Sequence, residues 1–400
     1  MAGSTTQSVR IVIVGNGMFG AAATRHLAEL GYPVLCIGAP PQRQDVRNAT
    51  ETNPPAHRVY SSHNDAARLT RHQDRNPEWA AVTRQAISQY RKIESASGIS
   101  FFEDVGCLIA ARPGGEGPGT DPLPGMIEAG IAHTYYEPGD TSWQRRWPDL
   151  AFPDSHYVAY EPSPAGYIRP KALIAAQNKL AGLAGATFVA DTVVDIVDRG
   201  GRNHLATAGG HTFQADHVLV AAGAFSNFNG LLPRAADVSL KSEVIVLGEV
   251  TPFSAERLRR VPTVKYLLDP GDLEGIYMIP PVTYEDGRSY IKMGANTRLD
   301  KTVAGLDQLQ RWFNADTDPE YLPILEPALR ALWPGIDFVS VRTQPCVITY
   351  SPHERPIIEE VRTGLSVATA GNGGGAKGSD AWGLAAANLV AKALSIKPHD

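Results

Sequence analysis

The feature that most constrains the fold is a glycine-rich turn between a strand pattern and a helix pattern. Arg10 to Val14 reads RIVIV, a run typical of a strand that is buried on both faces. The next six residues, Gly15 to Gly20, read GNGMFG, and small and apolar residues return at helical spacing from Met18 to Leu30. A second strand pattern covers Val34 to Ile37. The sequence therefore predicts a βαβ unit with parallel strands.

The turn has the G-x-G-x-x-G spacing of a dinucleotide-binding loop. Gly15 permits the tight turn, Gly17 lets the backbone approach a pyrophosphate, and Gly20 allows the helix to pack closely against the strand. The helix N-terminus, which begins with Met18 and Phe19, presents unpaired N–H groups and a positive dipole to the phosphates. A tight turn without a ligand is the alternative, and the βαβ context favours nucleotide binding.

One element of the nucleotide-binding pattern is missing. An acidic residue that binds the ribose hydroxyls is expected about 20 residues after the glycines, at the end of the second strand. The sequence there is Ile37-Gly38-Ala39. Gln42 and Arg43 are candidates for a ribose contact, and a 2′-phosphate, as in NADP, is the other possibility. The turn alone therefore leaves open which dinucleotide binds.

Composition excludes several classes of protein. The chain has 400 residues, 43% of them hydrophobic and 20% charged, which is ordinary for a globular protein and excludes wholesale disorder. The net charge is −5, so there is no overall basic surface for nucleic acid. The three cysteines include no CxxC pair, so we expect neither a disulfide framework nor a metal site. No segment approaches the roughly 20 apolar residues of a membrane span, and we expect a soluble, cytoplasmic protein without a membrane partner.

Later patterns indicate that the chain leaves its first domain and returns to it. A Pro/Gly-rich stretch, Arg112 to Gly125, predicts a loop, and Val238 to Gly294 has extended patterns with a turn at 285–287, which predicts antiparallel sheet. The remaining patterns predict helices over 170–183 and 379–394 and extended segments over 187–197, 217–222 and 365–369. The expected fold is α/β (α+β overall), with a Rossmann-type domain over 9–80, 155–235 and 344–396. A substrate domain with antiparallel sheet and helices is expected over 81–154 and 236–343.

Four segments, in order and spread over most of the chain, resemble the FAD-dependent D-amino-acid-oxidase superfamily. The first is GNGMFG, and the second is SSHNDAARLTR, Ser61 to Arg71. The third is the pair IYMIP and YIKMG, and the fourth is PCVITYSPHERPII followed by GNGGGAKG. Within the superfamily these segments resemble the branch of monomeric sarcosine oxidase, N-methyltryptophan oxidase and the fructosyl amino acid oxidases. The resemblance implies FAD as the cofactor, placed between the Rossmann-type domain and the substrate domain.

The resemblance also implies roles for individual residues. Cys346 matches the cysteine that is bonded through sulfur to the flavin, and Lys292 matches a lysine that activates oxygen beside it. Arg71 and Lys377 match the pair that binds the substrate carboxylate, and Tyr277 matches a pocket tyrosine. The further expected flavin contacts are Arg68, Val193, Gly223, Asn372, Gly373, Gly374, Gly375 and Lys377 itself.

Each of these residues also has a structural interpretation. Cys346 is compatible with a buried core cysteine, which is what we expect of the other two cysteines. Lys292 lies in an extended apolar stretch, where strand alternation allows it to point outward as well as toward the flavin. Arg71 is compatible with a solvated helix-face arginine, and Lys377 with a surface lysine at a helix N-terminus.

Two departures from the sarcosine oxidase pattern concern the substrate. Ile348 stands where those enzymes carry a pocket tyrosine, and Asn296 stands where they carry a histidine. Both changes alter the pocket wall and its hydrogen bonds, so we expect a bulkier or different secondary amino acid rather than sarcosine.

The expected activity is oxidation of the C–N bond of a secondary amine or N-substituted amino acid, with hydride transfer to FAD, imine hydrolysis and reoxidation by O2 to H2O2. The partners are then a small amine with a carboxylate, and O2, and we expect a monomer or a small homo-oligomer. Two alternatives stay open. One is an FAD-dependent amino acid dehydrogenase that uses another acceptor, and the other is a non-catalytic FAD-binding subunit of a larger oxidase.

Overall fold

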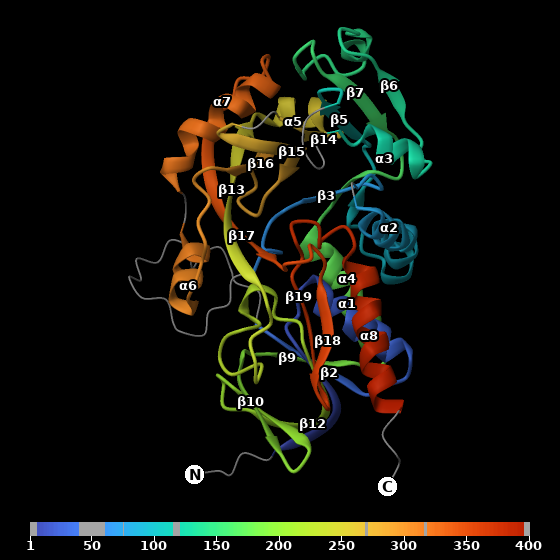
Figure 1. Cartoon of the computed structure of the whole chain (residues 1–400), viewed down its shortest axis with the longest axis vertical. Coiled ribbons are helices and arrows are strands. Elements are labelled where there is room, and N and C mark those ends of the chain that lie inside the picture. Colours follow the sequence, from blue (N-terminus) through green and yellow to red (C-terminus); the bar gives the residue numbers. More distant parts are fainter. Residues whose placement is uncertain are drawn as a thin grey trace.

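The chain forms two eight-stranded sheets that lie one above the other along the longest axis of the molecule (Figure 1). The computed structural model describes residues 6–39, 61–74, 76–114, 121–268, 271–315 and 318–395. Helices and strands alternate through these ranges, and the mixed architecture confirms the predicted α/β fold class.

The first sheet, in the lower half of Figure 1, is built around β1 (Gln7–Val14). β1 pairs in parallel with β2 (Val34–Gly38) on one side and β12 (Thr212–Val220) on the other, which confirms the predicted βαβ unit around α1 (Met18–Glu29). Two further strands pair in parallel, β9 (Thr187–Ala190) with β2 and β19 (Leu365–Thr369) with the end of β12. The antiparallel strands of this sheet are β10 (Val193–Arg199), β11 (Arg202–Thr207) and β18 (Ile357–Arg362).

Three helices cover one face of the first sheet: α1, α4 (Pro170–Leu183) and α8 (Ser379–Ser395) (Figure 1). Ile11 and Ile13 of β1 pack with Leu27 of α1 in one apolar cluster, while the strand residues between them face a second cluster. α1 and α8 approach closely because Gly383 has no side chain, and a Cβ there would lie 2.4 Å from Cβ of Ala22. The glycine-rich turn is therefore held between a buried strand and a tightly packed helix.

The second sheet is largely antiparallel and spans the upper half of Figure 1. Its order is β17 (Ser340–Tyr350), β13 (Ser239–Val250), β16 (Ser289–Thr297), β15 (Leu273–Thr283), β14 (Thr263–Tyr266), β5 (Cys107–Ala111), β7 (Tyr157–Glu161) and β6 (Thr134–Tyr136). Only the β14–β5 pair is parallel among its described neighbours. One face packs against α5 (Pro252–Leu258) and α7 (Leu322–Leu332), so its other face is available to line a site.

A small third sheet lies beside a long helix. It contains β3 (Arg68–Thr70), β8 (Gly166–Ile168) and β4 (Phe102–Glu103), and it packs against α2 (Pro77–Ser97). The shorter elements are α3 (Leu123–Glu128), α6 (Leu306–Asn314), η2 (Ser142–Arg145), η3 (Gly223–Phe225) and η4 (Pro319–Tyr321). Within the described ranges, no helix has both the length and the apolar character of a membrane span.

Several sequence predictions differ from the structure in detail. α1 ends at Glu29, so Leu30 is 57% exposed and does not belong to the apolar face of the helix. The predicted loop of 112–125 runs into α3, and 115–120 lie outside the described residues. α5 and β14 interrupt the predicted antiparallel region, and 187–197 forms parts of two strands. β7 and the second half of β17 fall in ranges predicted for the Rossmann-type domain, yet both strands belong to the second sheet.

Candidate functional site

A cavity of about 920 Å³ is lined by residues of both large sheets. The glycine turn after β1, residues 61–64 and the loop 371–377 line one part of it, and side chains of the second sheet line the other. Among the described residues to which the sequence analysis gave a role at the site, all but Gly20 and Lys292 line this cavity. Across the described part of the chain, no group of His, Cys, Asp and Glu side chains forms a metal site.

The glycine turn has the geometry of a phosphate-binding loop. Gly15 has φ +107°, and a Cβ at Gly20 would lie 1.9 Å from the Gly15 carbonyl oxygen, so Gly20 acts through packing. Gly17 is open, because the nearest atom to a Cβ there is Nδ1 of His63 at 3.6 Å. No side chain caps the N-terminus of α1, and Oδ1 of Asn16 is buried with no hydrogen-bond partner among the described residues. These groups fit a bound dinucleotide, because its pyrophosphate would accept from the free N–H groups.

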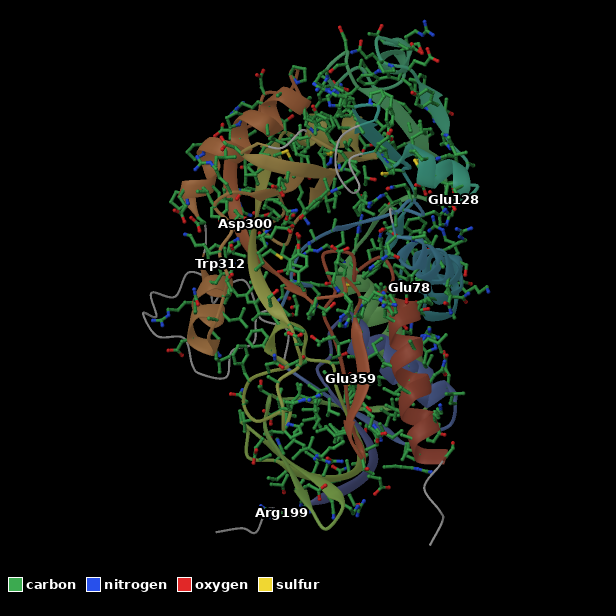
Figure 2. The ribbon with its side chains drawn as sticks, viewed as in Figure 1. Glu78, Glu128, Arg199, Asp300, Trp312 and Glu359 are labelled. Carbon is green, nitrogen blue, oxygen red and sulfur yellow. The ribbon has the colours of Figure 1, made fainter. Side chains whose placement is uncertain are left out.

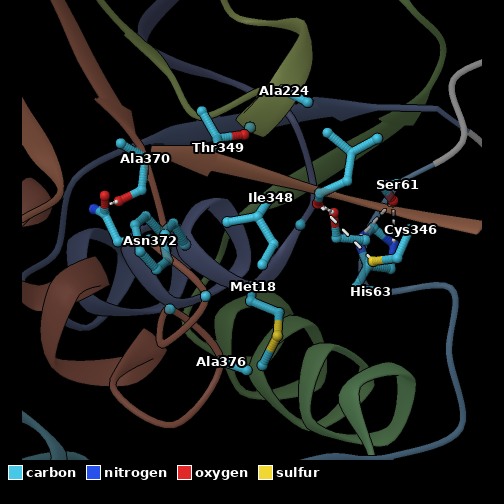
Figure 3. A pocket seen from close by; sticks show the side chains of 18 of the residues that line it. Met18, Ser61, His63, Ala224, Cys346, Ile348, Thr349, Ala370, Asn372 and Ala376 are labelled. Carbon is cyan, nitrogen blue, oxygen red and sulfur yellow. Dashed lines mark hydrogen bonds between the residues drawn. The ribbon is translucent and has the colours of Figure 1, made fainter. Parts of the chain in front are cut away.

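The second glycine-rich segment forms another part of the wall. Asn372 (φ +46°) and Gly373 (φ +71°) adopt left-handed backbone conformations. The Asn372 side chain fixes the segment, because its Oδ1 accepts from the Ser351 N–H (2.9 Å) and its Nδ2 donates to the Ala370 carbonyl (2.7 Å; Figure 3). The absence of side chains here leaves a wall that a flat ring can approach. The other predicted contacts that line the cavity are Gly374, Gly375, Val193, Gly223, Met18 and Phe19.

The edge where a ribose-binding acid was expected is arranged differently. Gly38 ends β2 there, and a Cβ on it would collide with Asn16 at 2.4 Å, so no side chain fits at this position. Asp191, which follows β9, lines the cavity beside it. Its carboxylate accepts from the Thr192 N–H (2.7 Å) and pairs with His211 (2.9 Å). Gln42 and Arg43, the residues proposed for this contact, lie outside the described residues.

Alternate residues of the second sheet form the opposite wall of the cavity. They project from the face opposite α5 and α7. Cys346 of β17 is paired with Glu243 of β13, and Tyr277 of β15 is paired with Lys265 of β14. The Tyr277 hydroxyl donates to the Glu243 carboxylate (3.2 Å), and the Tyr277 ring lies over Gly294, where a Cβ would be 2.4 Å from the ring. Strand pairing thus brings together polar groups that are distant in the sequence.

The two residues that depart from the sarcosine oxidase pattern also line the cavity. Ile348 of β17 lies near the second glycine segment, where its Cδ1 would be 3.5 Å from a Cβ at Gly373. Asn296 of β16 accepts at Oδ1 from Lys241 Nζ (3.4 Å). The cavity wall therefore has an apolar group and an amide at these positions.

Cys346 lies at one end of the cavity, beside Ser61 and His63 (Figure 3). Its Sγ is 3.8 Å from Arg68 Nη2. Its backbone carbonyl accepts from Nε1 of Trp312 (2.8 Å), a residue of α6 that is labelled in Figure 2. Burial, Lys171 and Arg68 lower the pKa of His63 to about 4, so the imidazole is neutral at pH 7.

The other two cysteines are core residues. Cys36 in β2 and Cys107 in β5 are 1% and 0% exposed. Burial raises the pKa of Cys36 to about 12 and that of Cys107 to about 11, so both thiols stay protonated at neutral pH. Cys346, by contrast, is the cysteine that lines the cavity.

Lys292 lies under the cavity wall rather than in the cavity. Its side chain is 1% exposed, and Nζ donates to Asp65 Oδ2 (2.5 Å) and to the Ala67 carbonyl (2.9 Å). Asp65 also accepts from Arg68 and from the Tyr284 hydroxyl (2.9 Å). Burial and the charge of Arg68 place the pKa of Lys292 well below its usual value. The inward orientation is thus observed, and the direct neighbour of the ammonium group is a carboxylate.

Arg71 and Lys377 meet at the cavity although they are far apart in the sequence. Lys377 is 4% exposed and is ion-paired with Asp74, and Arg71 Nε donates to Gln73 Oε1 (3.0 Å). Burial by itself would raise the pKa of Asp74, but the charges of Lys377 and Arg71 hold it below its usual value. Two cations and one carboxylate therefore form a group that can bind another carboxylate.

Five charged residues of this region escaped the sequence analysis. Asp65 lies inside the segment Ser61 to Arg71 and Asp74 lies just after it, and their partners are Lys292 and Lys377. Glu161 of β7 is 1% exposed and accepts from the backbone N–H groups of residues 72 and 73, which positions the Arg71 segment. Glu243 is 8% exposed in β13, and Lys265 stands between the buried Val264 and Tyr266 of β14. A charged residue at an alternating position of such a strand is the signal that could have identified them.

Comparisons with known proteins identify the family and the fold of the chain. Residues 10–389 match the sequence model of the FAD dependent oxidoreductase family, DAO. No protein with a curated description matches the chain. Among solved structures, the chain is similar to NikD, an amino acid oxidase of nikkomycin biosynthesis (20% identity, TM-score 0.74, 99% of this chain and 96% of that chain). It is also similar to the glycine oxidase of Geobacillus kaustophilus (20%, 0.70, 97% and 95%) and to the fructosyl amine:oxygen oxidoreductase Amadoriase I of Aspergillus fumigatus (18%, 0.69, 97% and 87%).

The structural matches share the fold over nearly the whole chain, and the family match covers the glycine turn, the sheet wall and the second glycine segment. The dinucleotide for which the turn is built is accordingly FAD. The chain belongs to the DAO family of FAD-dependent oxidoreductases.

Proposed function

We propose that the protein oxidises the C–N bond of a secondary amine or N-substituted amino acid, with O2 as the electron acceptor. The observation that carries this proposal is one cavity that holds both a dinucleotide-binding turn and the Arg71–Asp74–Lys377 group. The solved structures with the same fold include an amino acid oxidase, a glycine oxidase and a fructosyl amine oxidase by their names. An amino acid or amine with a carboxylate is the substrate class that suits both observations.

The first task of the protein is to orient the substrate. The terminal nitrogens of Arg71 have no acceptor among the described residues, so they are available for two parallel bonds to a carboxylate. Lys377 adds a positive charge that Asp74 partly neutralises. A carboxylate held here fixes the position of the adjacent carbon, which is the carbon that is oxidised.

The electron balance of the reaction is simple. The hydrogen on the carbon next to the amine nitrogen leaves as a hydride, with both electrons of the C–H bond. The nitrogen lone pair forms the C=N bond, and the amine proton passes to solvent. Water then hydrolyses the imine to an amine and a carbonyl compound. When bound, FAD supplies the two-electron acceptor and returns the electrons to O2, which gives H2O2.

Lys292 is proposed to assist the oxygen step. Its buried position beside Asp65 keeps it in a fixed orientation on the inner face of β16. The direct ion pair with Asp65 favours the ammonium form of Lys292 against the effect of burial. A positive charge held in a water-poor region favours negative charge that develops on oxygen, because the local dielectric is low.

Cys346 is proposed to bind the flavin covalently through Sγ. It is the cysteine that lines the cavity, and Arg68 lies 3.8 Å from its sulfur. The thiolate is the form of a cysteine that reacts with an electrophilic carbon. The two core cysteines have raised pKa values and no access to the cavity, which leaves Cys346 as the candidate.

The proposed activity is tested with purified holoenzyme and a panel of N-alkyl amino acids and cyclic imino acids. We expect loss of the yellow flavin absorbance without oxygen and formation of H2O2 in air. Loss of colour without peroxide, and turnover only with an artificial acceptor, would identify a dehydrogenase. A flavin that no amine reduces would point to a non-catalytic FAD-binding subunit.

The covalent link is tested by acid precipitation. We expect the yellow colour to stay in the pellet of the wild type and to move to the supernatant with C346S. A C36S variant, which alters a core thiol, is the control and should keep the colour in the pellet. A yellow supernatant from the wild-type protein would refute the link.

A further inference from the structure

Lys265 is a cavity residue to which neither the motifs nor the proposed reaction gives a role. It lies on β14 opposite Tyr277, in the wall formed by the second sheet. Its neighbours Val264 and Tyr266 face the other way and are buried in the apolar cluster under α5 and α7. Strand alternation therefore directs Lys265 to the cavity side of the sheet.

The partners of Lys265 differ from those of the other lysines at this site. Lys292 is paired with Asp65, and Lys377 is paired with Asp74. The ammonium group of Lys265 makes no hydrogen bond or ion pair with any described residue, although Asp74 and Glu243 also line the cavity. It is partly exposed to the cavity, so a ligand there can reach it.

Cations outweigh anions in their effect on Lys265. Burial, together with the charges of Arg71 and Lys377, lowers the pKa of Lys265 to about 8, against the opposing influence of Glu243 and Asp74. Three cations therefore share one end of the cavity, and one carboxylate, Asp74, is paired directly with one of them. Buried cations in protein sites are normally matched by anions, so this arrangement favours a ligand with more than one negative charge.

We propose that the substrate carries a second carboxylate and that Lys265 binds it, which makes the substrate a secondary amine dicarboxylate. This inference rests on the proposed function, in which Arg71 and Lys377 bind the first carboxylate. A single ammonium group matches a singly charged carboxylate better than a phosphate monoester, which would need a second cation of its own. Leu267 and Leu268, which follow Lys265 in the chain, also line the cavity and suit the short methylene chain between the two carboxylates.

The test compares matched substrates that differ in one charge. N-methylglutamate is paired with N-methylglutamine, and N-methylaspartate with N-methylasparagine. We expect wild-type kcat/KM to favour the acid over the amide by about 30-fold or more in at least one pair, the scale of a desolvated ion pair. K265M should remove most of this preference, because kcat/KM should fall for the acid and stay the same for the amide. K265R should keep part of the preference. K301M, which alters an exposed ion pair with Glu320, is the control and should retain the full preference.

A binding measurement separates this inference from the proposed oxidation. Glutarate has two carboxylates and no amine, and butyrate has one. We expect glutarate to raise the melting temperature of the wild-type holoenzyme more than butyrate does, and K265M to lose the difference. If no amine reduces the flavin but this difference holds, the proposed oxidation fails and the second carboxylate site stands.

Two outcomes would overturn the role of Lys265. The first is equal kcat/KM for acid and amide in both pairs, with K265M unchanged, while the amines still reduce the flavin. The second is a K265M variant that is slowed equally with all four substrates and loses a pH-dependent step near pH 8, because Lys265 would then act as a base toward the amine.

Discussion

Two of the buried charge clusters among the described residues differ in how completely their charges are matched. The helix cluster joins α1, α4 and α8 and consists of Arg25, His26, Glu29, Gln177 and Asp380. Arg25 pairs with Asp380 (2.7 Å) and Glu29 (2.7 Å), and Gln177 donates to Asp380 (2.8 Å). The cavity cluster consists of Arg71, Asp74, Glu243, Lys265 and Lys377, and within the described residues Lys265 and the terminal nitrogens of Arg71 have no partner.

The pKa shifts in the two clusters reflect this difference in pairing. In the helix cluster, His26, Arg25 and Gln177 overcome the effect of burial and lower the pKa of Asp380 to about 2. In the cavity cluster, burial raises the pKa of Glu243 and lowers that of Lys265, so both charged forms are disfavoured. A cluster whose charges are all paired stabilises the fold, whereas a cluster in which some charged forms are disfavoured is a candidate for ligand binding.

The largest effects are expected when the two arginines are exchanged for methionine. R25M leaves Asp380 buried without its main partner, so we expect a loss of about 3–5 kcal/mol in the free energy of unfolding. R71M removes a guanidinium group whose terminal nitrogens have no acceptor among the described residues. We therefore expect kcat/KM for a carboxylate substrate to fall about 100-fold with little change in stability. Urea unfolding and steady-state kinetics on both variants measure the contrast. Equal loss of stability in the two variants would remove the distinction between the clusters.

Lys292 is a boundary case, because it is fully paired yet has a proposed role in the reaction. K292M should lower the rate of the oxygen step about 100-fold, the scale for one preorganised electrostatic group. Anaerobic reduction of the flavin should change by no more than a few-fold, since Lys292 does not line the cavity. Stopped-flow absorbance follows both half-reactions. An unchanged oxygen step, with stability lost, would place Lys292 with the helix cluster as a structural ion pair.

A smaller effect is expected for the helix cluster when stability is measured at acidic pH. The folded-state pKa of Asp380 is about 2 against an ordinary value of 3.8, so its stabilisation is complete above about pH 4 and is lost as the pH falls toward 2. D380N should cost about 2 kcal/mol at pH 7 and should weaken the dependence of stability on pH in that acidic window. D307N, at an exposed ion pair with Arg311, is the control and should retain wild-type behaviour. A D380N variant with the acid dependence of the wild type would contradict this assignment.

The two parts of the cavity also differ in how far the sequence predicts them. The dinucleotide-binding turn was predictable because its determinants are local: the strand, the three glycines and the helix N-terminus are consecutive in the chain. The same holds for α4, whose observed bounds agree with its predicted 170–183. The resemblance of the chain to known sequences likewise predicted that Arg71 and Lys377 lie at one site, and both line the cavity.

The charge balance of the cavity was not predictable, because it depends on strand order and register. Glu243 reaches Tyr277 only because β13 and β15 both flank β16, and Lys265 lies opposite Tyr277 only through the β14–β15 register. The residues within β13 or β14 alone do not indicate that Tyr277 is the neighbour of Glu243 and Lys265. The pairing of Lys292 with Asp65 was missed for the same reason, since 227 residues separate them.

The smallest expected effect concerns Glu243. Its carboxyl group either resists ionisation or neutralises the cavity cations, and the two cases predict opposite changes in the stability of E243Q. Burial raises its folded-state pKa above 4.5, although the hydrogen bond from Tyr277 and the charge of Arg68 act against the shift. A raised pKa means that the folded state resists ionisation, so this group lowers stability as the pH rises above its unfolded value. E243Q keeps the shape and an acceptor for Tyr277 but cannot ionise. We therefore expect it to be more stable than the wild type at pH 7 by up to about 1 kcal/mol, with the difference closing near pH 4, as measured by urea unfolding at both pH values. A less stable E243Q at pH 7 would mean that the Glu243 anion already neutralises the cavity cations, and the demand for a ligand anion would then be smaller than the unpaired Lys265 suggests.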